Sequence, residues 1–154
     1  LRAQFRRHEP ERVYLAVVYS HPSPDSGTWR DHLVWDQRAL LQKPTGPCDP
    51  RGKEAESEYR VLETFRETSL LEVRLKTGKR NQIRLQARLH GHILVGEQRY
   101  VDGRGGLRRI SFGRQALHAH RLVFRHPVTQ RPVRFEASLP NDMTELIARL
   151  RHAV

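Results

Sequence analysis

Cysteine is nearly absent from this chain of 154 residues, in which Cys48 is the single example. One thiol makes no intrachain disulfide and leaves no metal site built from several cysteines. Long apolar runs are also absent, and the opening residues Leu1–Arg7 lack the pattern of a signal peptide. We therefore expect a soluble, cytoplasmic protein without a membrane partner.

The length suits a single domain with a hydrophobic core, spanning residues 1–154. Because the first residue is Leu1 and not Met, we also expect the sequence to be a piece of a longer protein, with a domain boundary upstream.

Acidic residues are few. Asp and Glu number 17 against 28 Lys and Arg, which gives a formal net charge of +11, and 24 of the 28 basic residues are Arg. No Asp or Glu occurs from Val73 to Gly96. Arg pairs with phosphates through a planar fork and stacks on bases, so this balance favours a nucleic-acid partner. A GC-rich genome would also raise the arginine content.

The acid-free stretch changes its hydrophobic period in the middle. From Leu71 to Leu75 apolar and charged residues alternate, which predicts a half-buried strand. Thr77-Gly78 interrupts this pattern, and Ile83 and Ala87 then follow at the i, i+4 spacing of a helix that ends near Gly91. The sequence therefore predicts a strand, a tight turn and a helix.

Arg80, Arg84 and Arg88 recur every fourth residue and are predicted to share one face of that helix. Like charges at this spacing cost a helix about 0.2–0.5 kcal/mol per pair. One interpretation is a solvated basic face, since Arg is a good helix former. The other is an anion site for phosphate or carboxylate, because a turn leading into a helix amino terminus exposes backbone N–H groups.

The remaining patterns give a coarse map of the chain. Strands are expected at Val13–Tyr19, Trp29–Trp35, Glu56–Glu63, Ser69–Lys76, His92–Tyr100, Gln115–Phe124 and Val133–Ala137. Loops or turns are expected at His21–Gly27, Leu40–Ala55, Asp102–Arg109 and His126–Gln130. Leu1–Arg12 is interpreted as a charged lead-in that ends a helix, and Asn141 as the N-cap of a final helix with the apolar stripe Met143, Leu146, Ile147 and Leu150.

Three further chemical interpretations of single residues and motifs are weighed here. Tyr14, at the start of a strand, suits either a core-edge tyrosine or a functional phenol. The histidines His90, His92, His118 and His120 form only a weak metal signal, because they lie on two separate segments. A Ser-His-Asp hydrolase lacks a G-x-S-x-G elbow to support it.

Four segments carry a resemblance to a known family. They are YLAVV (14–18), TGKRNQIR (77–84), GHILVGEQRY (91–100) and RQALHAHRLVFRHPVT (114–129). In this order they resemble the carboxy-terminal half of the RluA-type pseudouridine synthase catalytic domain. Departures include Lys79-Arg80-Asn81 for the commoner R-T-H, Ile93 for a usual Pro and Glu97 for a usual Asp. The family's H-R-L-D loop with its nucleophilic aspartate has no counterpart here, and we expect it to fall before Leu1.

The resemblance implies an α+β fold, with a mixed, mainly antiparallel sheet flanked by helices. It implies ribosomal or transfer RNA as the partner and no cofactor, and we expect a monomer without a metal. Arg84 is implied to pair with the missing aspartate and Tyr14 to pack against the target base. RNA contacts are expected for the basic residues Lys76, Lys79, Arg80, Arg88, Arg114 and His118, because phosphate binding tolerates exchange of Lys and Arg.

The resemblance therefore predicts an RNA pseudouridine synthase fragment. We expect it to isomerise uridine when joined to the aspartate-bearing half and to be inactive alone. The alternative is a non-catalytic RNA-binding module or degenerate homologue.

Overall fold

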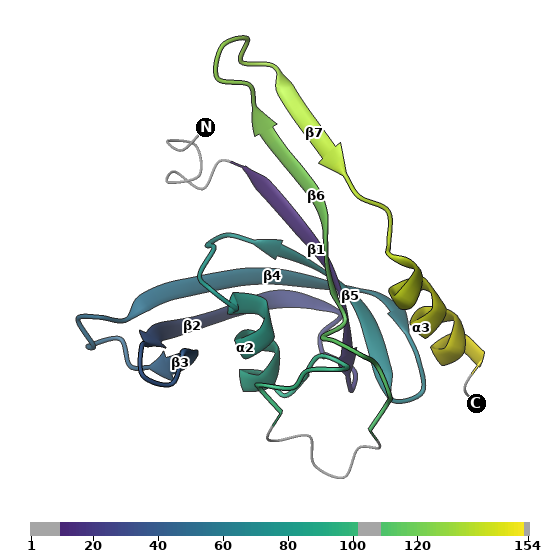
Figure 1. The fold of residues 1–154 in the computed structure, drawn as a ribbon. Helices are drawn as coiled ribbons and strands as arrows, with labels where there is room; N and C mark the ends of the chain where they lie inside the picture. Colours follow the sequence, from purple (N-terminus) through teal and green to yellow (C-terminus); the bar gives the residue numbers. More distant parts are fainter. Residues whose placement is uncertain (1–9, 102–108, 153–154) are drawn as a thin grey trace.

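The computed structural model describes residues 10–101 and 109–152, and these form one seven-stranded sheet with two helices (Figure 1). The elements are β1 Glu11–Tyr19, β2 Ser26–Asp36, β3 Leu41–Thr45, β4 Lys53–Thr64, β5 Thr68–Leu75, α2 Gln82–Leu89, β6 Leu117–Arg125, β7 Pro132–Glu136 and α3 Asn141–His152. The helical lead-in expected before residue 10 and most of the basic loop at 102–109 lie outside the described residues.

The strand order is β3-β2-β4-β5-β1-β6-β7, and all six strand pairs within the described chain are antiparallel. The expected α+β class with a mainly antiparallel sheet is therefore confirmed. The β6–β7 end of the sheet turns steeply away from the β2–β3 end in Figure 1, as the twist of antiparallel sheets requires. Two pairs of consecutive predicted strands form antiparallel hairpins, β4–β5 and β6–β7.

Strand β1 lies inside the sheet and separates two apolar layers. Its residues Leu15, Val17 and Tyr19 pack with the α3 stripe, whereas Ala16 and Val18 pack with Ile83 and Ala87 of α2. Successive side chains of a strand point to opposite faces, so α2 and α3 cover opposite faces of β1. Tyr14 packs against the α2 layer. Among the described residues no helix is both long and apolar enough to cross a membrane.

Three predicted local structures were wrong. The polar loop Leu40–Ala55 contains β3 and the start of β4, because β2 has a second neighbour at its outer edge. The apolar segment His92–Tyr100 is not a strand. It makes one isolated bridge, between Leu94 and Val18, and its Val95 N–H donates to the Val17 carbonyl. Its apolar side chains Ile93, Leu94 and Val95 fill the core without joining a ladder.

The third correction concerns the cap of the final helix. Helix α3 begins at Asn141 itself, and the Thr144 N–H donates to the Pro140 carbonyl, which is therefore the capping position. The predicted apolar stripe of this helix is confirmed, since all four of its residues are buried.

Candidate active site

The loop between β5 and α2 is organised by the first side chain of the helix. Gln82 is buried, and its Oε1 accepts from the Thr77 hydroxyl at 2.8 Å and from the Lys79 N–H at 2.9 Å. Asn81 then takes a left-handed conformation, φ 55°, and α2 follows without an acidic residue in its first turn. The predicted strand, turn and helix are confirmed, and the Gln82 amide fixes where Lys79 lies.

Arg80 precedes the helix, which corrects the predicted stripe of three arginines. Because α2 starts at Gln82, only Arg84 and Arg88 are helical residues. The Arg80 guanidinium instead lies over the Trp35 ring, with 4.3 Å between its Cζ and the ring centroid.

A second buried amide fixes α2 against the sheet. Gln86 accepts from the Ser57 hydroxyl at 2.6 Å and donates to the carbonyls of Trp29 at 3.1 Å and Ala55 at 3.2 Å. It also donates to the Asp31 carboxylate at 2.9 Å. Burial acts to raise the pKa of Asp31, but hydrogen bonds from His90 and Gln86 hold it below its ordinary value. The helix is thereby locked in rotation about its own axis.

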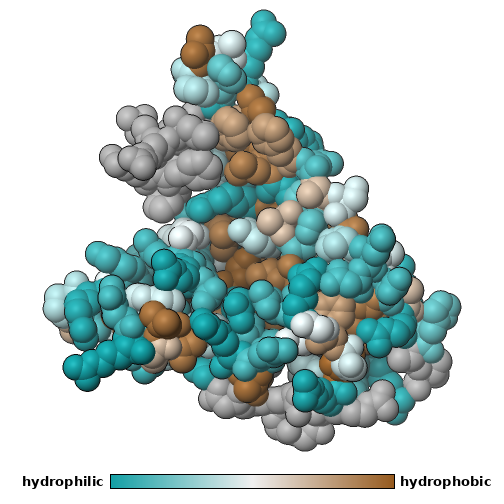
Figure 2. All heavy atoms as spheres, in the orientation of Figure 1, coloured by the Kyte–Doolittle hydropathy of each residue, from teal (hydrophilic) through white to brown (hydrophobic). Residues whose placement is uncertain are grey.

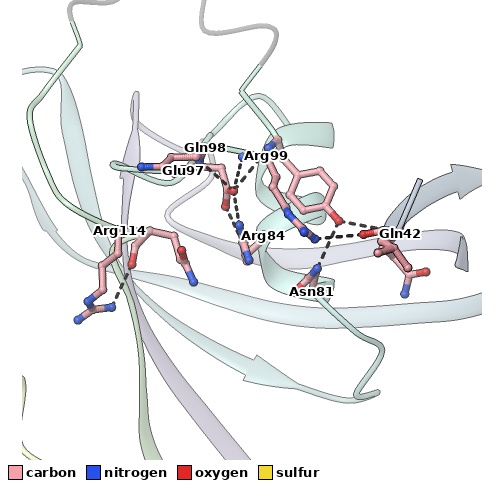
Figure 3. Close-up of polar contacts among 10 residues, drawn as sticks. Gln42, Asn81, Arg84, Glu97, Gln98, Arg99 and Arg114 are labelled. Carbon is pink, nitrogen blue, oxygen red and sulfur yellow. Dashed lines mark hydrogen bonds and ion pairs between the residues drawn. The ribbon is translucent and has the colours of Figure 1, made fainter. Parts of the chain in front are cut away.

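Arg84 makes a bidentate ion pair with Glu97 (Figure 3). Its Nε lies 2.8 Å from Oε2 and its Nη2 2.5 Å from Oε1. The Glu97 side chain is fully buried and the Arg84 side chain is 16% exposed. The backbone N–H groups of Gln98 and Arg99 also donate to Oε1. Burial acts to raise the pKa of Glu97, but these donors, with Arg84 foremost, lower it.

Arg84 is thus mostly buried and already has a carboxylate partner within the chain, Glu97. Nε and Nη2 are occupied, and Nη1 has no hydrogen-bond partner among residues 10–101 and 109–152. The guanidinium also lies 5.7 Å from the Tyr100 ring centroid. Hydrogen bonding to Glu97 raises the pKa of Arg84, so its charge is permanent.

Arg84 and Tyr14 line one cavity of about 230 Å³, together with Lys79. Leu75, Ile83 and Leu117 give it apolar walls, and no Asp or Glu is among the described residues around it. Since Glu97 balances Arg84, Lys79 leaves the cavity positive. This combination of an aromatic ring, apolar walls and excess positive charge suits a flat base next to an anionic group. We call it the Tyr14–Arg84 pocket.

The other predicted RNA contacts lie apart from this pocket. Lys76 pairs with Glu58 at 3.1 Å. Arg114 holds Asp142 through Nε at 2.9 Å and Nη2 at 3.1 Å, and its guanidinium points away from the Arg84–Glu97 pair in Figure 3. Arg88 lies in the last turn of α2.

The four histidines considered as metal ligands do not converge. His90 binds the Asp31 carboxylate and His92 the Tyr19 carbonyl. His118 and His120 both donate to the Ala137 carbonyl, at 2.8 Å and 3.0 Å. No group of three or more potential ligands for a metal ion occurs in the part of the chain that the structure describes.

Sequence reasoning missed the partners that position the site. Glu97 was noted only as a departure from the family pattern, yet it is the first acid after the acid-free stretch. That break in the charge pattern was the available signal. Gln82 and Gln86 gave none, since an amide on an amphipathic helix is ordinarily solvated.

Two solved structures share this fold. Human RNA Pseudouridylate Synthase Domain Containing 4 superposes with a TM-score of 0.78 at 19% identity, over 97% of this chain and 66% of that one. Human RNA Pseudouridylate Synthase Domain Containing 1 gives 0.71 at 21% identity, over 99% and 70%. At these identities the likeness establishes the fold, which is that of a pseudouridylate synthase domain.

Sequence relatives establish the family. The family model described as RNA pseudouridylate synthase matches residues 1–89. Ribosomal large subunit pseudouridine synthase D of Zymomonas mobilis is 36% identical over 97% of this chain and 48% of the relative. The uncharacterized RNA pseudouridine synthase YlyB of Bacillus subtilis is 41% identical over 91% and 44%. The chain belongs to the RNA pseudouridylate synthase family, so the RluA-type resemblance is confirmed. It spans about half the length of these curated relatives.

Proposed function

We propose that this chain forms one part of the active site of an RNA pseudouridine synthase, with the Tyr14–Arg84 pocket receiving the target uridine. The observation that carries the proposal is the meeting of Tyr14, Lys79 and Arg84 around one small cavity in a chain of this family. Tyr14 comes from β1, and Lys79 and Arg84 come from the β5–α2 loop and α2, so the fold brings together two segments that lie far apart in the sequence.

The reaction would isomerise uridine within RNA. The bond from the ribose C1′ to N1 breaks, the base rotates, and C1′ joins C5; the C5 proton leaves and N1 gains one, so atoms balance. In this proposal the target base is first flipped out of its RNA context. The cleavage is assisted by an aspartate that does not belong to the family motifs found in this chain. No cofactor is required by these steps.

Arg84 orients the aspartate in this proposal. Glu97 fixes the guanidinium by two hydrogen bonds, and Nη1 is left for a second carboxylate. A nearby guanidinium keeps such an acid ionised. The Tyr14 ring packs against the base, and Lys79 supplies the remaining positive charge. Arg80 and Arg88 are assigned to RNA phosphates, and Lys76, Arg114 and His118 to more peripheral contacts that compete with their present partners.

The rival proposal is a non-catalytic RNA-binding module. It is favoured by the fact that Arg84 already has a full carboxylate partner, which gives the residue a structural role without any aspartate. The target RNA, ribosomal or transfer, belongs to the first proposal; the cytoplasmic location and the monomeric state are common to both.

The test measures isomerisation directly. The 154-residue chain, and a version extended by the coding sequence upstream of Leu1, are incubated with unmodified cellular RNA. Nucleosides are then separated by chromatography before mass spectrometry, since the isomers have equal mass. We expect an H-R-L-D-like sequence upstream, pseudouridine from the extended version and none from the chain alone. An extended version that binds RNA without isomerising it supports the rival.

A further inference from the structure

A second hollow adjoins the Tyr14–Arg84 pocket on the side of the β2–β3 hairpin. Its volume is about 630 Å³, and Trp35, Leu40, Lys53 and Arg80 are among its lining residues. Lys79 lines both this hollow and the pocket, so the two are neighbours. We call it the hairpin hollow.

The hairpin hollow is positively charged. Four cationic residues line it and no Asp or Glu is among its described lining residues. Arg51 has Asp49 at 3.8 Å, whereas Lys53, Lys79 and Arg80 make no ion pair within residues 10–101 and 109–152. Over β2 and β3, Figure 2 shows a small hydrophobic area ringed by hydrophilic side chains. Such a surface combines apolar contact with phosphate binding.

Its central feature is a stacked pair. The Arg80 guanidinium lies over the indole of Trp35, with Cζ 4.3 Å from the ring centroid, and the Arg80 side chain is exposed. Arginine planes and aromatic rings are the platforms on which proteins stack unpaired bases. A paired base has both faces covered by its neighbours, so this platform selects single strands.

The platform is built rigidly onto the pocket. Gln42 of β3 is buried, and its Nε2 donates to the Arg80 carbonyl at 3.0 Å. Its backbone N–H donates to the Tyr100 hydroxyl at 3.1 Å (Figure 3). The Tyr100 ring in turn lies against the guanidinium of Arg84. A nucleotide held in the hollow is therefore positioned relative to the pocket without a flexible link.

We propose that the hairpin hollow binds the single-stranded nucleotide next to the target uridine. Its base stacks on the plane of the Trp35–Arg80 pair, the edge of the Arg80 guanidinium keeps the phosphate contact proposed above, and Lys53 and Lys79 contact further phosphates. The proposal rests on the proposed function, because the pocket is taken to hold the target. It assigns Trp35 a role in selecting unpaired flanks of the target site.

Binding of short labelled RNAs to the 154-residue chain tests this assignment. Trp35→Ala should weaken binding of a single-stranded octamer about tenfold, as loss of one stacked base does. Arg80→Lys keeps the charge but loses the plane, so it should weaken binding severalfold. Lys43→Ala is the matched control. It removes a cation from the same hairpin, but Lys43 pairs with Asp36 and does not line the hollow, so affinity should hardly change.

Tryptophan fluorescence reports the stacking itself. Trp29 is buried, 3% exposed, and Trp35 is the other of the two tryptophans. Single-stranded RNA should quench the chain's emission, a duplex of equal length should not, and Trp35→Phe should remove the quenching. This readout and Arg80→Lys decide the matter even if Trp35→Ala fails to fold.

Normal binding by both Trp35→Ala and Arg80→Lys would overturn the proposal. So would a loss with Arg80→Ala but not Arg80→Lys, which indicates a phosphate contact only. Isomerisation by the extended version is measured separately. Activity without stacking would refute this inference and leave the proposed function intact. Stacking without activity would refute the proposed function and leave a site for single-stranded RNA.

Discussion

Replacing Glu97 by Gln should destabilise the protein strongly, because it leaves the Arg84 charge without its buried partner. The side chain of Glu97 is fully buried, and its Oε1 accepts from Arg84 and from the N–H groups of Gln98 and Arg99. Gln has the same shape, but its NH₂ group replaces one carboxylate oxygen. A donor would then face the N–H donors that this oxygen accepts from.

The magnitude follows from the burial. Removing one partner of a buried ion pair costs about 3–5 kcal/mol, and we expect the lower end, about 3 kcal/mol, because Arg84 reaches solvent. Its side chain is 16% exposed. For a chain of this length that corresponds to a Tm about 6–12 °C lower. Differential scanning calorimetry at pH 7 measures it.

Glu63→Gln is the matched control. Glu63 accepts from Nε and Nη2 of Arg151, both at 2.8 Å, so the pair has the same bidentate geometry at the surface. Exposed pairs contribute little, and the control should lower Tm by a fraction of the Glu97 effect. Equal shifts for the two variants would refute the argument from burial.

The pH dependence gives the same prediction an independent check. The folded-state pKa of Glu97 is lowered from its ordinary value of 4.5. Its contribution to stability is therefore complete above that value and is lost as the pH falls through the folded pKa. The difference in Tm between the protein and Glu97→Gln should be widest near neutral pH and narrow below about pH 4.5. A Tm difference that stays constant down to low pH would contradict this prediction.

Three further variants test the site and its support. In the catalytically complete protein, Arg84→Lys should abolish most single-turnover activity, because an ammonium cannot hold two carboxylates through parallel hydrogen bonds. RNA affinity should change well under tenfold. A normal reaction rate with weakened RNA binding would instead identify Arg84 as a phosphate contact. Arg80→Ala with Arg88→Ala should flatten the slope of log affinity against log salt by about one unit, and an unchanged slope returns them to a solvated face. Gln86→Leu should cost about 3 kcal/mol in urea unfolding, since it strands buried donors and acceptors, and a loss below about 1 kcal/mol would contradict that.

Local patterns predicted much of this sheet because burial imposes them directly. The alternation at Leu71–Leu75 and the apolar run Val13–Tyr19 come from strands with buried faces. β3 was missed because an edge strand has few buried residues, and Pro44 lies within it. The strand predicted at His92–Tyr100 was wrong because apolar residues there fill the core from an irregular backbone. Hydrophobic periodicity does not distinguish such a segment from a buried strand.

The candidate site likewise has one part that the sequence predicted and one part that it did not. Motifs assigned Arg84 and Tyr14, and the structure brings both to one cavity. The Arg84–Glu97 pair joins a helix to a segment with no periodic relation to it, and the Trp35–Arg80 stack joins a hairpin to the helix entry. Such contacts depend on how separate elements meet, so they follow from the tertiary fold and not from spacing along the chain.

The central place of β1 has a consequence for how the protein is made. Leu15 pairs with Glu72 on one side and with His118 on the other. On the ribosome, this apolar strand emerges before both of its partners, and both of its edges stay open until β5 has been synthesised. Open strand edges are templates for pairing with other chains. Only β6 pairs the second edge, so β1 precedes β2, β3, β4 and β5 along the chain yet keeps one open edge until all of them have been made.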